Sequence, residues 1–222
     1  WAVRDGDVNP FCQGNFDFAD DVDGSDAHTF KQHFGRNQYV NPCPSDGPAP
    51  VERTWQTDCY DNGGSLVSCM GTGQDGEYQK GVIWPNPRFT DNSDGTVKDN
   101  LTGLIWLKHA SCFDQRTWEE ALADCNGLSA GWCGLTDGSN PGYWRLPHYK
   151  ELFSLVDAEN FNPALPSGHP FENVQSYNYW SSTSHAGNTA YAWRVHMESG
   201  AVGFYYKYYD DYFYVWCVRG GH

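Results

Sequence analysis

The sequence has no CxxC pair, little positive charge and no long apolar run. Its 222 residues include 28 Asp and Glu but only 14 Lys and Arg, so the formal net charge is -14. A surface of this charge repels phosphate backbones and sulfated polymers, and the basic residues are scattered, which argues against nucleic acid as a partner. No apolar stretch approaches the ~20 residues of a membrane-spanning helix, so we expect no membrane span.

Eight cysteines are present, and their spacing helps to separate three uses: disulfides, zinc ligands and buried thiols. They are Cys12, Cys43, Cys59, Cys69, Cys112, Cys125, Cys133 and Cys217. Zinc sites favour close cysteine pairs, which this chain lacks, whereas an even number of cysteines fits a set of disulfides. Because disulfides persist in oxidising compartments, the cysteines predict a secreted or cell-surface protein.

Two regions differ in composition. The 24 glycines and 12 prolines favour turns over long helices throughout. Residues 1–80 have few aliphatic side chains, whereas periodic apolar patterns begin at Ile83, so we predict a disulfide-bonded N-terminal appendage over 1–80 and a main domain over 81–222. In the appendage we expect a helix over 26–34, and a hairpin between Cys59 and Cys69 that turns at residues 61–64 and is closed by a disulfide of its own.

The main domain alternates strand and helix patterns. Residues 88–108 combine short β-prone runs with Asn-Asp-Gly turns. A helix is predicted to begin at Thr117, because Thr117 and Glu120 can form a capping box. Its buried face would be formed by Trp118, Ala121, Leu122 and Cys125.

A second helix is expected after Pro147. Its buried stripe would consist of Leu152, Leu155 and Val156, with Lys150 and Glu151 on the outside. Strand patterns resume from Tyr177 to Val218. The order strand, helix, helix, strands indicates an α+β fold with many loops.

The most informative segment is residues 204–214, FYYKYYDDYFY, in which eight of eleven residues are aromatic. Core strands are served better by Val, Ile and Leu, which leave no hydroxyl to satisfy. Nine of the 14 tyrosines lie within residues 177–214 among Ser, Asn, Gly, Asp and His, a composition typical of paratopes. Tyrosine is also a good strand former, so an ordinary sheet with an aromatic outer face is the alternative. The pattern favours a recognition surface.

Catalytic motifs are missing. The eight histidines are not joined by an HExxH, a GxSxG or a paired-carboxylate motif. Since an enzyme needs a positioned acid, base or nucleophile, we predict binding without enzymatic activity.

Four stretches occur in order from about residue 80 to the end: RFTDNSDGTVKDNLTGLIWLK, TWEEALADCN, WRLPHYKEL, and NYWSSTS continuing to YVWCVRGG. Together they resemble the Lcl C-terminal domain family. The resemblance implies a C-type-lectin-like fold, with two helices and a twisted, mostly antiparallel sheet, and an extracellular binding module. It also implies that Cys125 of the first helix pairs with Cys217 of the last strand, which leaves Cys112 with Cys133. The EPN, QPD and WND motifs of calcium-dependent sugar binding are absent.

The segment NFDFADDVDGSDAHTFKQHFG resembles a single dockerin-type or EF-hand-type calcium loop. The resemblance implies five calcium ligands, namely Asn15, Asp17, Asp21, Asp23 and Asp26. Two positions depart from the pattern, because Ala19 replaces an aspartate and Asp20 a glycine, and the loss of a carboxylate should lower affinity. The alternative is a solvated acidic turn between Cys12 and Cys43.

The C-terminal region also resembles the variable proteins of diversity-generating retroelements, in which a reverse transcriptase substitutes residues at template adenines near the end of a target gene. Asn codons would diversify there to a set that includes Tyr, Asp, Ser, His, Phe, Asn and Gly. Candidate ligand-binding residues of these types are Ser184, His185, Asn188, Tyr191, His196, Phe204, Tyr206, Tyr208, Tyr209, Asp210, Asp211 and Phe213. A family member that is not diversified is the alternative.

Other residues of this region are predicted to be fixed scaffold. Met197, Glu198 and Lys207 cannot arise from such codons. Six further residues have the spacing expected of the buried face of strands: Trp180, Trp193, Val195, Val202, Val215 and Trp216.

These observations lead to one main hypothesis and two others. The main one is an extracellular protein that binds a protein or glycan ligand at a cell or virus surface through a Tyr/Asp-rich, diversified surface. The second is a glycan- or matrix-binding adhesin module without diversification. The third is attachment to a partner through the calcium-like segment, in the manner of a dockerin.

Overall fold

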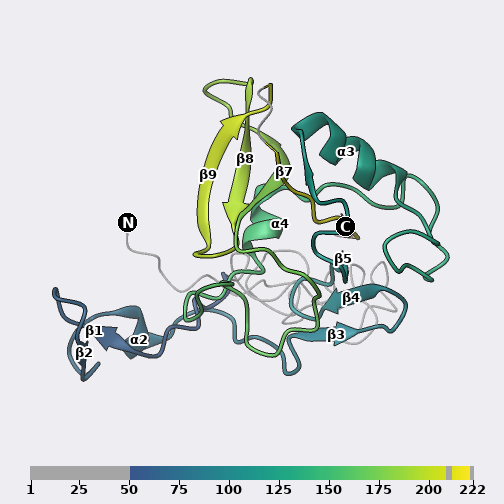
Figure 1. The fold of residues 1–222 in the computed structure, drawn as a ribbon. Coiled ribbons are helices and arrows are strands. Elements are labelled where there is room, and N and C mark those ends of the chain that lie inside the picture. The colour runs from purple at the N-terminus through teal and green to yellow at the C-terminus, as the bar shows by residue number, and fades with distance from the viewer. Residues whose placement is uncertain (1–50, 209–211, 221–222) are drawn as a thin grey trace, which may run out of the picture. The chain divides into compact units, whose positions relative to one another are not determined.

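The computed structural model of the chain describes residues 51–208 and 212–220 (Figure 1). The helices are α2 (Asp75–Tyr78), α3 (Trp118–Gly127) and α4 (Tyr149–Phe153). The strands are β1 (Cys59–Tyr60), β2 (Leu66–Val67), β3 (Phe89–Asp91), β4 (Thr96–Asp99), β5 (Ile105–Leu107), β6 (Gln115–Arg116), β7 (Asn178–Ser184), β8 (Tyr191–His196), β9 (Ala201–Tyr206), β10 (Phe213–Tyr214) and β11 (Val218–Arg219). Strands and helices both contribute, so the α+β prediction is confirmed.

Three sheets are formed. The first is the β1–β2 pair, the second has the order β11-β5-β4-β3, and the third has the order β6-β10-β7-β8-β9. All pairs are antiparallel except β10 with β7. Residues Arg53–His222 group as one unit by their contacts, and the boundary near residue 80 stays a prediction.

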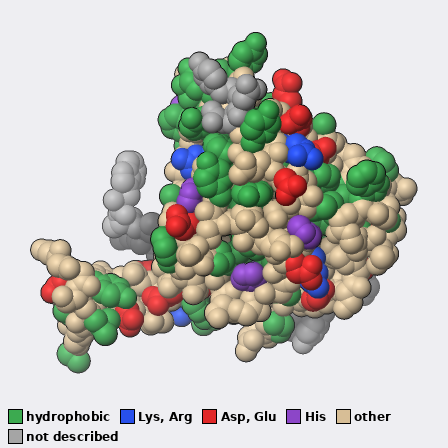
Figure 2. Space-filling model, in the orientation of Figure 1, with side chains coloured by type: hydrophobic (Ala, Val, Ile, Leu, Met, Phe, Trp, Pro, Cys, Tyr) green, Lys and Arg blue, Asp and Glu red, His purple; other side chains and the backbone are tan. Residues whose placement is uncertain are grey.

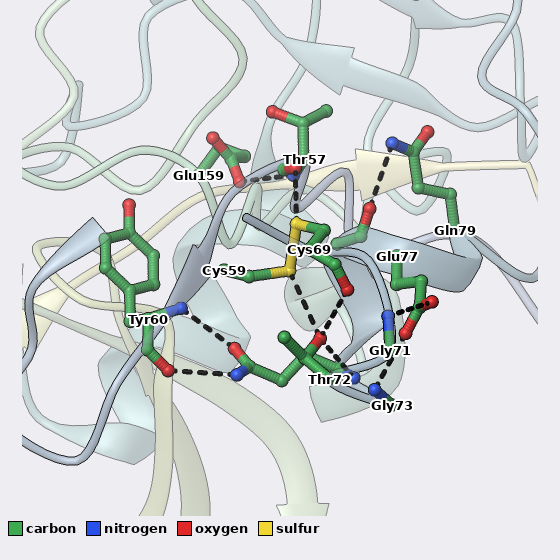
Figure 3. Close-up of a disulfide and its surroundings, with 12 residues drawn as sticks. Thr57, Cys59, Tyr60, Cys69, Gly71, Thr72, Gly73, Glu77, Gln79 and Glu159 are labelled. Atoms are coloured by element: carbon green, nitrogen blue, oxygen red, sulfur yellow. Dashed lines mark hydrogen bonds between the residues drawn. A yellow bond between two sulfur atoms is a disulfide. The ribbon is translucent and has the colours of Figure 1, made fainter. Parts of the chain in front are cut away.

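The hairpin between Cys59 and Cys69 forms as predicted and is closed by its own disulfide, with the Cα atoms 5.2 Å apart (Figure 3). The Thr72 hydroxyl donates to the Cys69 carbonyl oxygen at 2.9 Å. The Glu77 carboxylate accepts from the N–H groups of Gly71 and Gly73, and these bonds lower its pKa. A disulfide and a carboxylate thus order a segment that contributes little to the apolar core.

The helix α3 begins where the sequence predicts. The Thr117 side chain accepts from the Glu120 N–H, and the Glu120 carboxylate accepts from the Thr117 N–H, so the capping box is complete. Ala121 and Cys125 are buried, and Trp118 and Leu122 pack against the core from its margin. The predicted apolar face of this helix is confirmed.

The core is centred on Trp216. Its ring packs edge-on against Trp106 and Phe171, with centroids 5.6 and 4.8 Å apart, and its indole N–H donates to the Leu107 carbonyl oxygen at 2.8 Å. The Cys125–Cys217 disulfide lies beside it, and Cys112 is bonded to Cys133. Both disulfides implied by the family resemblance are therefore present.

Burial agrees with most of the scaffold predictions. The fully buried members of the predicted set are Trp180, Val195, Met197, Val215 and Trp216. Val202 is different, since its side chain is 38% exposed, and the prediction that it is buried is wrong. It lies on β9, which pairs with β8 on one side only.

The prediction for α4 is correct for the start of the helix and only partly correct for its side chains. The helix follows Pro147 and ends at Phe153. Leu152 within it and Leu155 beyond it are fully buried, whereas Val156 is only partly buried against the core. Glu151 was expected outside but is only 9% exposed, because its carboxylate accepts a pair of hydrogen bonds from Arg145, at 2.7 and 2.6 Å. It also accepts from the His148 N–H at 2.9 Å and so caps the helix.

We predict that Glu151→Gln destabilises the protein at neutral pH by about 1 to 3 kcal/mol, the usual range for hydrogen bonds to a charged group. Burial alone would raise the pKa of Glu151, but the bonds from Arg145 and His148 outweigh it and hold the pKa below its usual value of 4.5. A lowered pKa gives stability that is present above pH 4.5 and is lost as the pH falls through the folded-state value. The difference in the free energy of unfolding between Glu151→Gln and the wild type should therefore disappear in acid.

Urea unfolding at pH 7 and at pH 3 measures this gap. The matched control is Glu119→Gln on the exposed side of α3, which should show a gap of about 1 kcal/mol or less at pH 7, the usual contribution of an exposed carboxylate in the first turn of a helix. An equal gap for Glu151→Gln at both pH values would contradict the account.

Candidate ligand-binding site

The strands β7, β8 and β9 form two successive antiparallel hairpins that carry most of the predicted binding residues. In the second hairpin Tyr191 is opposite Tyr206, and Trp193 is opposite Phe204. Because side chains alternate along a strand, these four rings project from the same face. The loop after β7 adds His185 to that face, with its ring 5.4 Å from the Trp193 ring.

We call His185, Tyr191, Trp193, Phe204 and Tyr206 the aromatic cluster. The His185 and Phe204 centroids are 4.2 Å apart, and those of Tyr191 and Tyr206 are 3.9 Å apart. Phe204 meets both Tyr191 and Trp193 edge to face, at 90° and 84°. Edge-to-face contacts are the favoured geometry for aromatic pairs, so the rings hold one another in place.

The helix α4 supports the aromatic cluster. The Tyr149 ring stacks on Trp193 with 5.1 Å between centroids and 24° between planes. The Tyr149 N–H donates to the Thr183 hydroxyl on β7 at 3.2 Å. The aromatic cluster is therefore supported by α4, which is itself bonded to β7, and both elements lie outside residues 204–214.

Part of the aromatic cluster is accessible. Phe204 is 45% exposed, and Tyr208, two residues beyond the end of β9, is 92% exposed. Ser184 and Asn188 are also exposed. On the face drawn in Figure 2, hydrophobic side chains lie beside basic, acidic and histidine side chains over the part of the surface that β8 and β9 occupy in Figure 1. Exposed rings next to small polar groups match the composition that the sequence analysis singled out.

Lys207 behaves as a scaffold residue. Its ammonium group lies 3.9 Å from the centroid of the Trp118 ring, donates to the Ser184 hydroxyl, and has its pKa lowered by burial. Its backbone N–H donates to the Ala190 carbonyl oxygen at 2.9 Å. These contacts tie the end of β9 to α3 and to the β7–β8 loop.

Two predicted binding residues lie apart from the aromatic cluster. His196 belongs to the opposite face of β8, where its ring is 6.0 Å from Tyr177 and its Nδ1 is 3.8 Å from the Glu198 carboxylate. Phe213 is 4% exposed and packs on Trp180, with centroids 4.4 Å apart. The Phe213 ring therefore lies in the core in this structure, covered on its other side by Tyr205.

Other predictions fall outside the described residues. These are the binding candidates Tyr209, Asp210 and Asp211, the calcium candidates Asn15, Asp17, Asp21, Asp23 and Asp26, the helix over 26–34, and the cysteines Cys12 and Cys43. Within residues 51–208 and 212–220, no group of three His, Cys, Asp or Glu side chains is placed to hold a metal ion. Calcium binding stays a prediction.

The sequence analysis missed two members of this site. Trp193 was assigned to the buried scaffold, but it is half-buried and its ring contributes to the aromatic cluster. Its position two residues after Tyr191 could have shown this, because both lie on one face of a strand. Tyr149 was assigned no role, and no sequence signal joins it to β8.

A concave region lies beside the four-stranded sheet. It is a cavity of about 450 Å³ whose lining includes Asp91, Lys108, His109 and Glu172. The Lys108 ammonium group is 2.9 Å from Glu172 and 3.1 Å from Asp91, and its pKa is raised by these two carboxylates. One ammonium group pairs with two carboxylates, so the lining keeps an excess of negative charge.

The fold and the site define an α+β domain that presents partly exposed aromatic rings on an antiparallel sheet. The sequence matches the Lcl C-terminal domain over residues 95–219, more than half of its length. The chain belongs to the Lcl C-terminal domain family, and this membership suggests a C-type-lectin-like ligand-binding module. A search of curated proteins finds no match to the chain. The helices of the described ranges are all too short and too polar to cross a bilayer.

We predict that Phe213→Ala and Phe204→Ala have very different effects on stability, although both remove the same ring. Phe213→Ala opens a cavity in the core and should cost about 3 to 5 kcal/mol. Phe204→Ala removes a half-exposed ring and should cost about 1 kcal/mol or less. Denaturant unfolding of the two variants measures the difference, and similar losses would show that Phe204 belongs to the core.

Proposed function

We propose that this chain is an extracellular ligand-binding protein whose recognition surface is the aromatic cluster with Ser184, Asn188 and Tyr208 around it. The observation that carries the proposal is the exposure of Phe204 and Tyr208 beside rings that are already held by mutual packing. Rings fixed before binding lose little conformational freedom when a partner covers them. Desolvated aromatic side chains of this kind are the usual hot spots of protein interfaces.

Binding is proposed in preference to catalysis. The aromatic cluster contains one histidine, His185, and histidine is the side chain most often used as a general acid or base. Its Nδ1 accepts a hydrogen bond from the Asn188 N–H at 3.2 Å, which serves the turn between β7 and β8. A general base needs a free nitrogen aimed at a substrate proton, and this contact favours a structural role for that nitrogen.

The extracellular location is proposed from the cysteines. All six cysteines in the described ranges are paired in disulfides. Disulfides of this number are rare in reducing compartments, so an oxidising one is favoured.

The proposal includes diversification of the recognition surface by a retroelement. The predicted fixed residues Trp180, Val195 and Trp216 are fully buried, whereas Ser184, Asn188 and Tyr208 are exposed. Replacing exposed side chains leaves the core intact, so this distribution would allow many sequences on one scaffold. Phe213 is the exception, because its ring is part of the core.

We predict that the gene lies near a reverse transcriptase gene and a near-copy of its own 3′ coding end. The two copies should differ at adenine positions of the template, and the differences should fall on the codons of the exposed candidates. Sequencing of the flanking DNA tests this. Flanking DNA without a near-copy would contradict diversification and leave the binding proposal standing.

We also predict that peptides selected from a phage-displayed random library bind at the aromatic cluster. Phe204→Ala and Tyr208→Ala should each weaken the selected peptides about tenfold or more, as expected for hot-spot rings. The control is Tyr60→Ala, an exposed tyrosine of the β1–β2 hairpin, which should leave affinity unchanged. Isothermal titration calorimetry provides the affinities.

The second candidate, a glycan- or matrix-binding adhesin, would use the same exposed rings to stack on sugars. Selective binding to a glycan array with no peptide selected would favour it. Peptides whose affinity is unaffected by both Phe204→Ala and Tyr208→Ala would contradict the proposed surface.

A further inference from the structure

The strand β9 is the edge of the five-stranded sheet. Its sequence, AVGFYY, pairs with β8 over six residues in an unbroken register (Figure 1). Proteins usually protect such an edge with a charged side chain, a proline or a bulge. The described edge has none of these devices, which makes its outer side suited to pairing with another strand.

The hydrogen-bond pattern shows which groups point outward. The Lys207 N–H donates to the Ala190 carbonyl oxygen, so these two residues form a hydrogen-bonded pair. In an antiparallel sheet, opposite residues alternate between hydrogen-bonded and non-hydrogen-bonded pairs. Gly203 and Tyr205 therefore bond to β8, and Val202 and Phe204 direct their N–H and C=O groups away from it. On the other side of β8, the Met197 N–H donates to the Tyr177 carbonyl oxygen. Alternate residues of β8 therefore bond to the strands on its two sides, as the same pattern requires. Outside the strand ladders, none of the main-chain hydrogen bonds of the described ranges involves Val202 or Phe204.

We propose that β9 pairs antiparallel with β9 of a second copy of this chain, about a two-fold axis at Gly203. In this register Val202 of each copy lies opposite Phe204 of the other. The outward N–H and C=O groups of Val202 in one copy then bond to those of Phe204 in the other copy, on both sides of the axis. An aromatic ring opposite a β-branched side chain is a favourable cross-strand pair. Gly203 then faces its own copy at a non-hydrogen-bonded position, where Cα atoms approach to about 4.5 Å and a residue without a side chain fits best.

Charge favours this edge as the place where two copies meet. Each copy carries a net charge of -14, so most pairs of surfaces repel one another. The six residues of β9 carry no charge. Arg194 of β8 lies over Gly203 on the face opposite the aromatic cluster, with its guanidinium 3.3 Å from where a Cβ of residue 203 would stand. The Arg194 side chains of the two copies would therefore approach each other across the axis and repel. Added salt screens both repulsions and should strengthen the dimer.

The dimer would have a consequence for binding. A two-fold axis perpendicular to the sheet keeps the same face of β8 and β9 on the same side in both copies. Two aromatic clusters would then lie on one face of a continuous ten-stranded sheet. Such a dimer can engage a repetitive surface at two points, which raises its avidity without new contacts.

Two measurements on the wild-type chain test the proposal. Sedimentation equilibrium should show a monomer at low micromolar and a dimer at high micromolar concentration, with more dimer at higher salt. Hydrogen exchange should show the amides of Val202 and Phe204 slowing about tenfold or more as the dimer forms, because the new ladder protects them. A monomer at every concentration would overturn the proposal, and so would protection of both amides in the monomer, which would mean that the chain covers its own edge.

Two variants locate the interface. Val202→Pro and Phe204→Pro each remove an outward N–H that the bonds to β8 do not use, so the fold should survive and the dimer should be lost. Phe204→Leu keeps the N–H and should still dimerise. A dimer that persists in the folded proline variants would overturn the proposal, and if a proline variant fails to fold, the amide exchange of the wild type decides. Loss of peptide binding in Phe204→Ala with the dimer retained would separate this proposal from the proposed function.

Discussion

The disulfide between Cys125 and Cys217 closes a loop that contains α4 and the strands from β7 to β10. Its ends are 92 residues apart, and in the chain-entropy account a closed loop of this length stabilises the fold by about 4 to 5 kcal/mol. The residue before Cys217 is Trp216, whose ring fills the centre of the core against Trp106 and Phe171. A covalent bond and a buried indole therefore fasten the chain directly after the recognition strands. The β7–β9 hairpins can vary at their outer face because both ends of this region are held.

The division between scaffold and surface follows from this constraint. On one face of β8 and β9, Val195 is fully buried whereas Phe204 is 45% exposed, and Lys207 anchors the end of β9 by its contact with Trp118. Rings that contact one another edge to face are rigid before a ligand arrives, so binding costs them little conformational freedom. The same strand presents both side chains and main-chain groups at a surface, so one edge is suited to both the proposed ligand binding and the proposed self-association.

Local signals in the sequence were reliable where the deciding contacts are close in the chain. The capping box at Thr117 and the hairpin between Cys59 and Cys69 depend on neighbours within ten residues, and both were predicted correctly. Long-range pairing was different: Cys125 with Cys217 was available only from family resemblance. Glu151 was misplaced because its burial depends on Arg145 six residues away and on a helix too short to show a clear periodicity.

The binding site was predictable in composition and only partly in geometry. The richness in Tyr, His, Asn and Ser marked the strands that carry the aromatic cluster, but it could not distinguish the two faces of β8 or separate the buried Phe213 from the exposed Phe204. Those distinctions require the register between strands, which no single stretch of sequence contains. The support of Trp193 by Tyr149 joins residues 44 positions apart and is likewise a property of the tertiary fold.

The central claim is that recognition takes place on the aromatic face of β8 and β9. A crystal structure of the chain bound to a library-selected peptide tests it most directly. The account predicts that the peptide covers Phe204 and Trp193 and leaves the Cys125–Cys217 disulfide and its surrounding core unchanged. A peptide seated in the cavity lined by Asp91, Lys108 and Glu172, with the aromatic cluster uncovered, would contradict it.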